Sequence, residues 1–82
     1  MRIIVTPKAL TQHKRLPKTE VTKIEQRLRL LEINPYLGKK LEGKFAGLYT
    51  LRVWPYRIIY FIENKQKTIF VVSVIHRQGA YK

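Results

Sequence analysis

Residues 49–62 read YTLRVWPYRIIYFI, and this stretch decides the fold because its hydrophobic pattern has a period of two. Before Trp54 and Pro55 the odd positions are apolar and the even positions are Thr50 and Arg52, as in a strand with one buried face. After this turn, the run YRIIYFI is apolar at both parities, which is typical of a central strand. We therefore expect two consecutive strands joined at the turn.

A third strand follows a polar turn, because residues 68–75 read TIFVVSVI. If its alternation is regular, Ser73 shares a face with Ile69, and His76 and Arg77 face opposite sides. Only a bulge or the end of the strand would then let His76 and Arg77 act at one site.

Upstream, the run RIIVT is a short β-rich segment, and Thr6 and Pro7 look like the start of a helix that Pro17 ends. A second helix runs from Pro17 through apolar residues at helical spacing to Asn34 and Pro35. The order is β-α-α-β-β-β. We predict an α+β fold in which an N-terminal strand and a three-stranded C-terminal meander form a mainly antiparallel sheet, with the two-helix hairpin packed on it.

The chain is short and strongly basic. Its 82 residues include 17 Lys and Arg against five acidic residues, which gives a formal net charge of +12. Like charges on so small a domain repel one another, which indicates a polyanionic partner, either nucleic acid or an acidic protein. The alternative is that the charge only aids solubility. Because a chain of this length has room for one hydrophobic core, we expect a single domain over residues 1–82.

Composition also excludes classes of chemistry. There is no Cys, no Asp and only one Ser, so a Ser-His-Asp triad, a Cys-His pair and a two-Asp magnesium clamp are excluded. The glycines match neither dinucleotide-binding nor P-loop spacing. A zinc site would need both histidines, His13 and His76, to converge with glutamates. If the protein is an enzyme, we expect it to work without a metal or a small-molecule cofactor.

The same features bear on location. The lack of Cys fits a reducing compartment. The N-terminal residues do not read as a signal peptide, and the longest apolar stretches are far shorter than the roughly 20 residues that span a bilayer. We expect a cytoplasmic protein with no membrane partner.

Three stretches together resemble the RelE/ParE superfamily of bacterial and archaeal toxins: the two-helix hairpin, residues 47–62 and residues 67–81. The family pattern is a glycine, a strand ending in Leu-Arg, a short turn, Tyr-Arg followed by apolar residues, and a last strand closing on His-Arg with a Tyr soon after. The matching residues here are Gly47, Leu51, Arg52, Tyr56, Arg57, His76, Arg77 and Tyr81. The resemblance covers essentially the whole chain.

The resemblance implies the toxin of a type II toxin–antitoxin pair, neutralised by a cognate antitoxin whose binding segment we expect to be acidic. RelE-like members are ribosome-dependent ribonucleases, and ParE-like members inhibit DNA gyrase. We predict a metal-independent endoribonuclease that binds the ribosome and cleaves mRNA in the A site by 2′-hydroxyl attack. Two alternatives stay open, because one fold serves several functions: a gyrase inhibitor, or a weakened member that only binds its antitoxin.

The resemblance also assigns catalytic residues. Arg57 matches the strand arginine, whose planar fork can grip two phosphate oxygens. Arg77 would be a second phosphate clamp or assist the leaving group, and His76 would act as an acid or a base. Tyr81 would stack on an RNA base or take part in proton transfer. The structural alternatives are an Arg57 that bonds carbonyl groups at the strand end and a solvated C-terminal tail.

The basic residues outside this set are predicted RNA contacts. Lys39, Lys40 and Lys44 lie in the run GKKLEGK, which suits contact with the phosphates of ribosomal RNA. Arg52 would contact RNA or the ribosome as well. The alternative for the lysines is an ordinary solvated loop.

One departure from the RelE pattern concerns the general base. That pattern has lysines on the strand before the arginine, where we align Leu48 and Thr50 of this sequence. Proton abstraction would then fall to His76, or to Lys44 or a nearby lysine, or the protein would be a weak nuclease.

Overall fold

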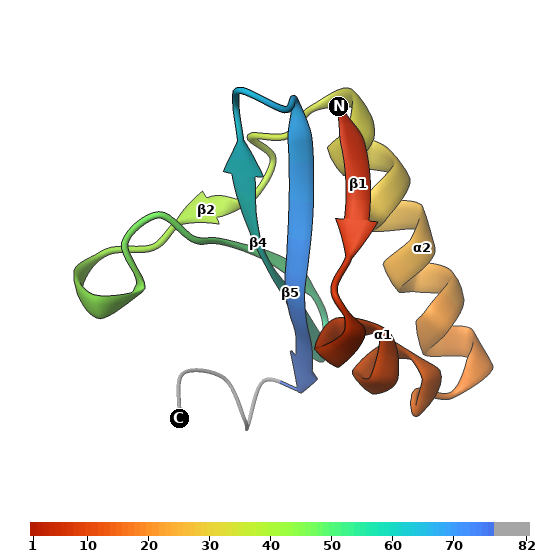
Figure 1. Cartoon of the computed structure of the whole chain (residues 1–82). Coiled ribbons are helices and arrows are strands. Elements are labelled where there is room, and N and C mark those ends of the chain that lie inside the picture. The colour runs from red at the N-terminus through yellow and green to blue at the C-terminus, as the bar shows by residue number, and fades with distance from the viewer. Residues whose placement is uncertain (77–82) are drawn as a thin grey trace.

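The computed structural model describes residues 1–76 (Figure 1). The predicted site residues Arg77 and Tyr81 lie outside the described residues. In chain order the elements are β1 (Arg2–Val5), α1 (Pro7–Lys14), α2 (Lys18–Ile33), β2 (Lys39–Lys40), the 3-10 helix η1 (Gly43–Phe45), β3 (Tyr49–Val53), β4 (Tyr56–Glu63) and β5 (Thr68–His76).

The strands form one sheet in the order β1-β5-β4-β3-β2. Strand β1 runs parallel to β5, and every other neighbouring pair is antiparallel. The predicted α+β class and the β-α-α-β-β-β order are confirmed. The sequence did not predict β2, because two exposed lysines, Lys39 and Lys40, carry no hydrophobic alternation.

The helices begin and end at the signals in the sequence. The Thr6 hydroxyl accepts a hydrogen bond from the Ala9 amide at 3.4 Å, and Pro7 occupies the first turn of α1. Helix α2 follows Pro17 and ends at Asn34, whose extended backbone stops the helix. Figure 1 shows both helices on the same side of the sheet, with α2 beside β1. Within residues 1–76, no helix is both long and apolar enough to cross a membrane.

The core lies between the helices and one face of the sheet, which we call the helix face. Ala9, Ile24 and Leu31 of the helices are fully buried there. They pack with alternate residues of the central strands, namely Leu51, Val53, Ile58, Tyr60, Ile69, Val71 and Val74. This contiguous apolar cluster is the main source of stability in so small a chain.

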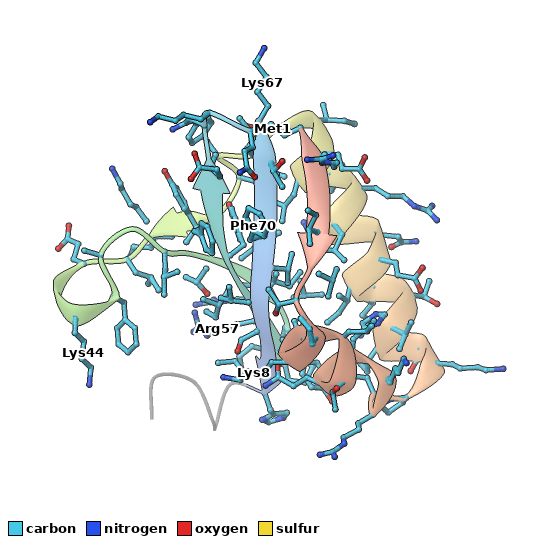
Figure 2. The ribbon with its side chains drawn as sticks, viewed as in Figure 1. Met1, Lys8, Lys44, Arg57, Lys67 and Phe70 are labelled. Atoms are coloured by element: carbon cyan, nitrogen blue, oxygen red, sulfur yellow. The ribbon has the colours of Figure 1, made fainter. Side chains whose placement is uncertain are left out.

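The residues that alternate with these core residues along the same strands form the opposite face of the sheet, which we call the open face. Direct pairs across the ladder, such as Arg52 with Arg57 and Arg57 with Ile75, fix which residues share it. By this register the open face carries Lys39, Thr50, Arg52, Arg57, Ile59, Phe61, Phe70, Ser73 and Ile75. Figure 2 shows Arg57 on the side of β5 away from the two helices.

The regular alternation predicted for the last strand is wrong. Ile59 pairs with Ser73 but the next residue, Tyr60, pairs with Val71, so Val72 is an extra residue in the ladder. Such a bulge shifts the parity of a strand by one residue. Ile69 and Val71 therefore share the helix face with Val74 rather than with Ser73.

Candidate functional site

A hollow of ≈ 370 Å³ opens on the sheet beside the open-face cations. Strands β2, β3 and β4 and the loop before β2 contribute its walls. The lining residues are Leu37, Lys39, Thr50, Leu51, Arg52 and Arg57. Half of them are cationic, so the hollow suits an anion with an apolar part.

Two of these cations lie opposite each other on neighbouring strands of the sheet. Arg52 on β3 and Arg57 on β4 are direct register partners on the open face. Like charges in directly opposed positions destabilise a sheet. Two guanidinium groups that line one hollow can bind the same anion, because each planar fork matches the oxygens of a phosphate or a carboxylate.

Thr50, which lines the hollow, has a buried hydroxyl group. Its side chain is only 6% exposed, and its Oγ1 atom has no hydrogen-bond partner among the described residues. A buried polar group without a partner costs about 1–3 kcal/mol. A ligand oxygen in the hollow would supply the missing partner.

The loop that forms one wall is held by Tyr60, whose ring is in the core. The Tyr60 hydroxyl accepts a hydrogen bond from the Gly38 amide at 2.9 Å and donates one to the Pro35 carbonyl, also at 2.9 Å. Burial raises the pKa of Tyr60 above its ordinary value of 10.0, and the Gly38 amide partly offsets that rise. A Cβ atom at Gly38 would lie 2.5 Å from the Tyr60 hydroxyl and 2.8 Å from the Thr50 carbonyl oxygen. Only glycine fits this approach.

His76, a predicted catalytic residue, lies at the exposed end of β5. It pairs with Tyr56, and the two rings meet edge to face with their centroids 5.4 Å apart. Tyr56 packs against the core cluster on the helix face, whereas its neighbour Arg57 is on the open face. Strand register therefore separates His76 from Arg57, and His76 is not among the residues that line the hollow.

The three predicted loop lysines occupy different settings. Lys39 lines the hollow and is the register partner of Thr50. Lys40 is exposed and pairs with Tyr49, so it has the opposite parity. Lys44 is in η1, with its ammonium nitrogen 5.3 Å from the centre of the Phe45 ring. Figure 2 shows Lys44 in the loop far from the helices.

Sequence reasoning missed three features of this site. It treated Thr50 only as the loss of a lysine, although the alternation in residues 49–53 already put it on one face with Arg52. It also missed the pairing of Lys39 with Thr50 and the contact between Gly38 and Tyr60. These last two had no local signal, because each joins segments distant in the chain.

No metal site is evident in the described part of the chain, since no three His, Cys, Asp or Glu side chains of residues 1–76 gather closely enough to hold an ion. The functional groups that the hollow offers are guanidinium, ammonium and hydroxyl groups. They bind and stabilise anions rather than coordinate metals.

The fold is shared with small α+β proteins that occur in toxin–antitoxin complexes. Residues 3–81 match the family described as ParE toxin of type II toxin–antitoxin system, parDE. The chain belongs to this family, within the RelE/ParE toxin superfamily, and the resemblance noted in the sequence is confirmed.

Individual relatives agree with this assignment. Toxin RelG of Mycobacterium tuberculosis is 33% identical over 46 residues, a segment that covers 56% of this chain and 53% of RelG, so the match spans about half of that relative. The RelBE2 toxin–antitoxin complex of the same organism has a chain with a TM-score of 0.86 at 26% identity, covering 93% of this chain and 96% of that one. The archaeal RelE–RelB complex of Pyrococcus horikoshii gives 0.79 at 28% identity, with 96% and 97% covered.

Proposed function

We propose that this toxin is a ribosome-dependent endoribonuclease that cleaves mRNA in the A site and so stops translation in the cytoplasm. The observation that carries the proposal is that Arg52 and Arg57, register partners on β3 and β4, line the same hollow. Two guanidinium groups at one hollow suit a phosphodiester, whose charge grows during cleavage.

In the proposed reaction the 2′-oxygen of a ribose attacks the adjacent phosphorus, and the bond from phosphorus to the 5′-oxygen breaks. A base takes the 2′-hydroxyl proton, and an acid gives a proton to the departing 5′-oxygen. The products are a 2′,3′-cyclic phosphate and a free 5′-hydroxyl. Arg57 would hold the phosphate oxygens, with Arg52 opposite it on the neighbouring strand.

The proton-transfer roles stay proposals. His76 is an acid–base candidate, but its place beside Tyr56 means that it would have to approach the RNA from the edge of the sheet. Arg77 and Tyr81 keep their proposed roles at the phosphate and at a base, and both lie outside the described residues. Because acid–base groups are sparse at the hollow, the ribosome would contribute by bending the mRNA into in-line geometry.

Two kinds of macromolecular partner follow. The net charge of +12 favours fast association with ribosomal RNA, through lysines such as Lys40 and Lys44. A cognate antitoxin with an acidic binding segment would neutralise the toxin, and the solved RelBE2 and archaeal relatives are complexes with antitoxins.

Gyrase inhibition is the second candidate, and the description of the matching family as ParE toxin favours it. A gyrase inhibitor would act by binding and would not need a phosphate-cleaving site. An inactive member that only binds antitoxin is the third candidate, and Leu48 and Thr50 in place of lysines keep it open.

The test is primer extension on an mRNA in a programmed ribosome, with gyrase supercoiling measured alongside. Wild-type protein should cut within the A-site codon, and Arg57→Ala should not. Arg27→Ala is the matched control, because Arg27 is an exposed arginine on α2. No cutting together with loss of supercoiling would move the protein to the gyrase-inhibiting branch, and neither effect would leave antitoxin binding alone.

A further inference from the structure

We propose that Lys39 and Thr50 form a second phosphate subsite, which holds the mRNA phosphate next to the one that is cut. The inference rests on the proposed function and goes beyond it, because it assigns Lys39 to binding of the mRNA substrate rather than of ribosomal RNA. It also gives a role to the short strand β2, which the cleavage reaction itself does not require.

The register of the sheet supplies the geometry. Lys39 pairs with Thr50, and two residues further along β3 Arg52 pairs with Arg57. Two residues of strand span about 6–7 Å. Successive phosphates of a single RNA strand have a comparable spacing. An RNA strand that lies along β3 would therefore place one phosphate at the Lys39–Thr50 pair and the next at the Arg52–Arg57 pair.

The Thr50 hydroxyl is the second observation that points to a ligand. Thr50 lines the hollow and is more than nine-tenths buried, and its Oγ1 atom has no hydrogen-bond partner among the described residues. A hydroxyl can donate to a phosphate oxygen while the Lys39 ammonium provides charge. A neutral donor beside one lysine is a binding subsite rather than a second cleavage centre.

The segment before Lys39 is held close to the sheet, which fixes where β2 starts. Gly38 is bonded to the Tyr60 hydroxyl and packs against the Thr50 backbone too tightly for a Cβ atom. A long lysine side chain then extends from a positioned backbone, which reduces the entropy lost on binding. Lys65 provides the control, because it is exposed in the turn between β4 and β5 and does not line the hollow.

The experiment is single-turnover cleavage on ribosomes programmed with synthetic mRNA. One set of mRNAs carries a neutral methylphosphonate on the 5′ or the 3′ side of the cut, with a 2′-deoxy sugar before it so that the neutral linkage is not attacked. On native mRNA, Lys39→Ala should slow cutting by about 10- to 100-fold, the value of a charged hydrogen bond. Lys65→Ala should stay within about threefold of wild type, as expected of a solvent-exposed charge in the turn between β4 and β5.

The neutral linkage gives the decisive comparison. One of the two positions should slow the wild-type protein, and on that mRNA Lys39→Ala should cause no further loss. Thr50→Val should also slow cutting of native mRNA, and Thr50→Ser, which keeps the hydroxyl, should restore it. Equal losses for Lys39→Ala and Lys65→Ala, or a Lys39→Ala effect that persists on both neutral mRNAs, would overturn the subsite. If wild-type protein cuts no mRNA, the proposed function fails and the subsite with it.

Discussion

The helix face and the open face of the sheet take alternate residues from the same strands. On the helix face, Ile58 and its neighbours are apolar and almost completely buried. On the open face, Arg57 and Arg52 oppose each other, and the buried Thr50 hydroxyl has no partner among the described residues. The helix face is an ordinary buried sheet face, whereas the open face is basic and contains a buried hydroxyl group without a partner among the described residues. This contrast supports the binding role proposed for the open face, and neighbouring residues can be used to separate stability from activity.

The largest expected effect comes from breaking the helix face. Ile58 is fully buried, so Ile58→Ala should lower the free energy of unfolding by about 2–5 kcal/mol through lost burial and a cavity. Equilibrium urea denaturation measures this. Ile33→Ala is the matched control, because that isoleucine is 83% exposed, and it should change the free energy by less than about 0.5 kcal/mol. Equal effects of the two variants would contradict the assigned core.

A somewhat smaller loss is expected where the two faces meet, at the contact between Gly38 and Tyr60. Gly38→Ala should cost about 1–3 kcal/mol, because its Cβ would overlap the Tyr60 hydroxyl and the Thr50 carbonyl oxygen. The midpoint of urea denaturation should fall, and mRNA cutting should fall with it as the loop before Lys39 shifts. An unchanged midpoint would mean that the loop does not pack against Tyr60.

Removing only the hydroxyl group of Tyr60 should lower the free energy of unfolding by less. Tyr60→Phe keeps the ring but leaves the Gly38 amide and the Pro35 carbonyl without their partner, at a cost of about 1 kcal/mol. The pH dependence has a definite sign. Because the folded-state pKa of Tyr60 is raised above 10.0, the unfolded chain loses this proton first, and stability falls as pH rises through that range. The fall should be smaller in Tyr60→Phe, and identical alkaline profiles for the two proteins would contradict the buried hydroxyl.

The smallest effect should have the opposite sign. Arg52→Gln removes one of two opposed charges on the open face, so stability at low salt should rise by about 0.2–1 kcal/mol. Salt screens such charges, so the gain should shrink at about 1 M NaCl. Thermal unfolding at both salt concentrations measures it, and mRNA cutting should nevertheless drop. A loss of stability would show that Arg52 contributes more to packing than repulsion removes.

The sequence predicted the elements that depend on local pattern. Thr6, Pro7 and Pro17 marked the helix ends, and the alternation around Thr50 and Arg52 marked a half-buried strand. The sequence did not predict the features that depend on pairing with a neighbouring strand. The bulge at Val72 is visible only in the pairing of β4 with β5, and strand β2 exists because Lys39 and Lys40 pair with β3.

The same division holds for the candidate site. Arg57 could be placed at a strand end from the sequence, and Arg52 from its parity with Thr50. That Arg52 faces Arg57, that Lys39 joins them, and that His76 lies beside Tyr56 all depend on strand register. Register is set by turns and core packing across the whole sheet, so no local motif reports it.

The most direct test of the division between the faces is Arg57→Ala, measured for cutting and for stability on the same preparation. Single-turnover cleavage on the ribosome should fall by about 10²–10³-fold, as when one transition-state charge stabiliser is removed. The free energy of unfolding in urea should fall by no more than about 1 kcal/mol, because Arg57 lies outside the core cluster. Cutting at the wild-type rate, or a loss of activity that parallels a loss of stability, would contradict the account.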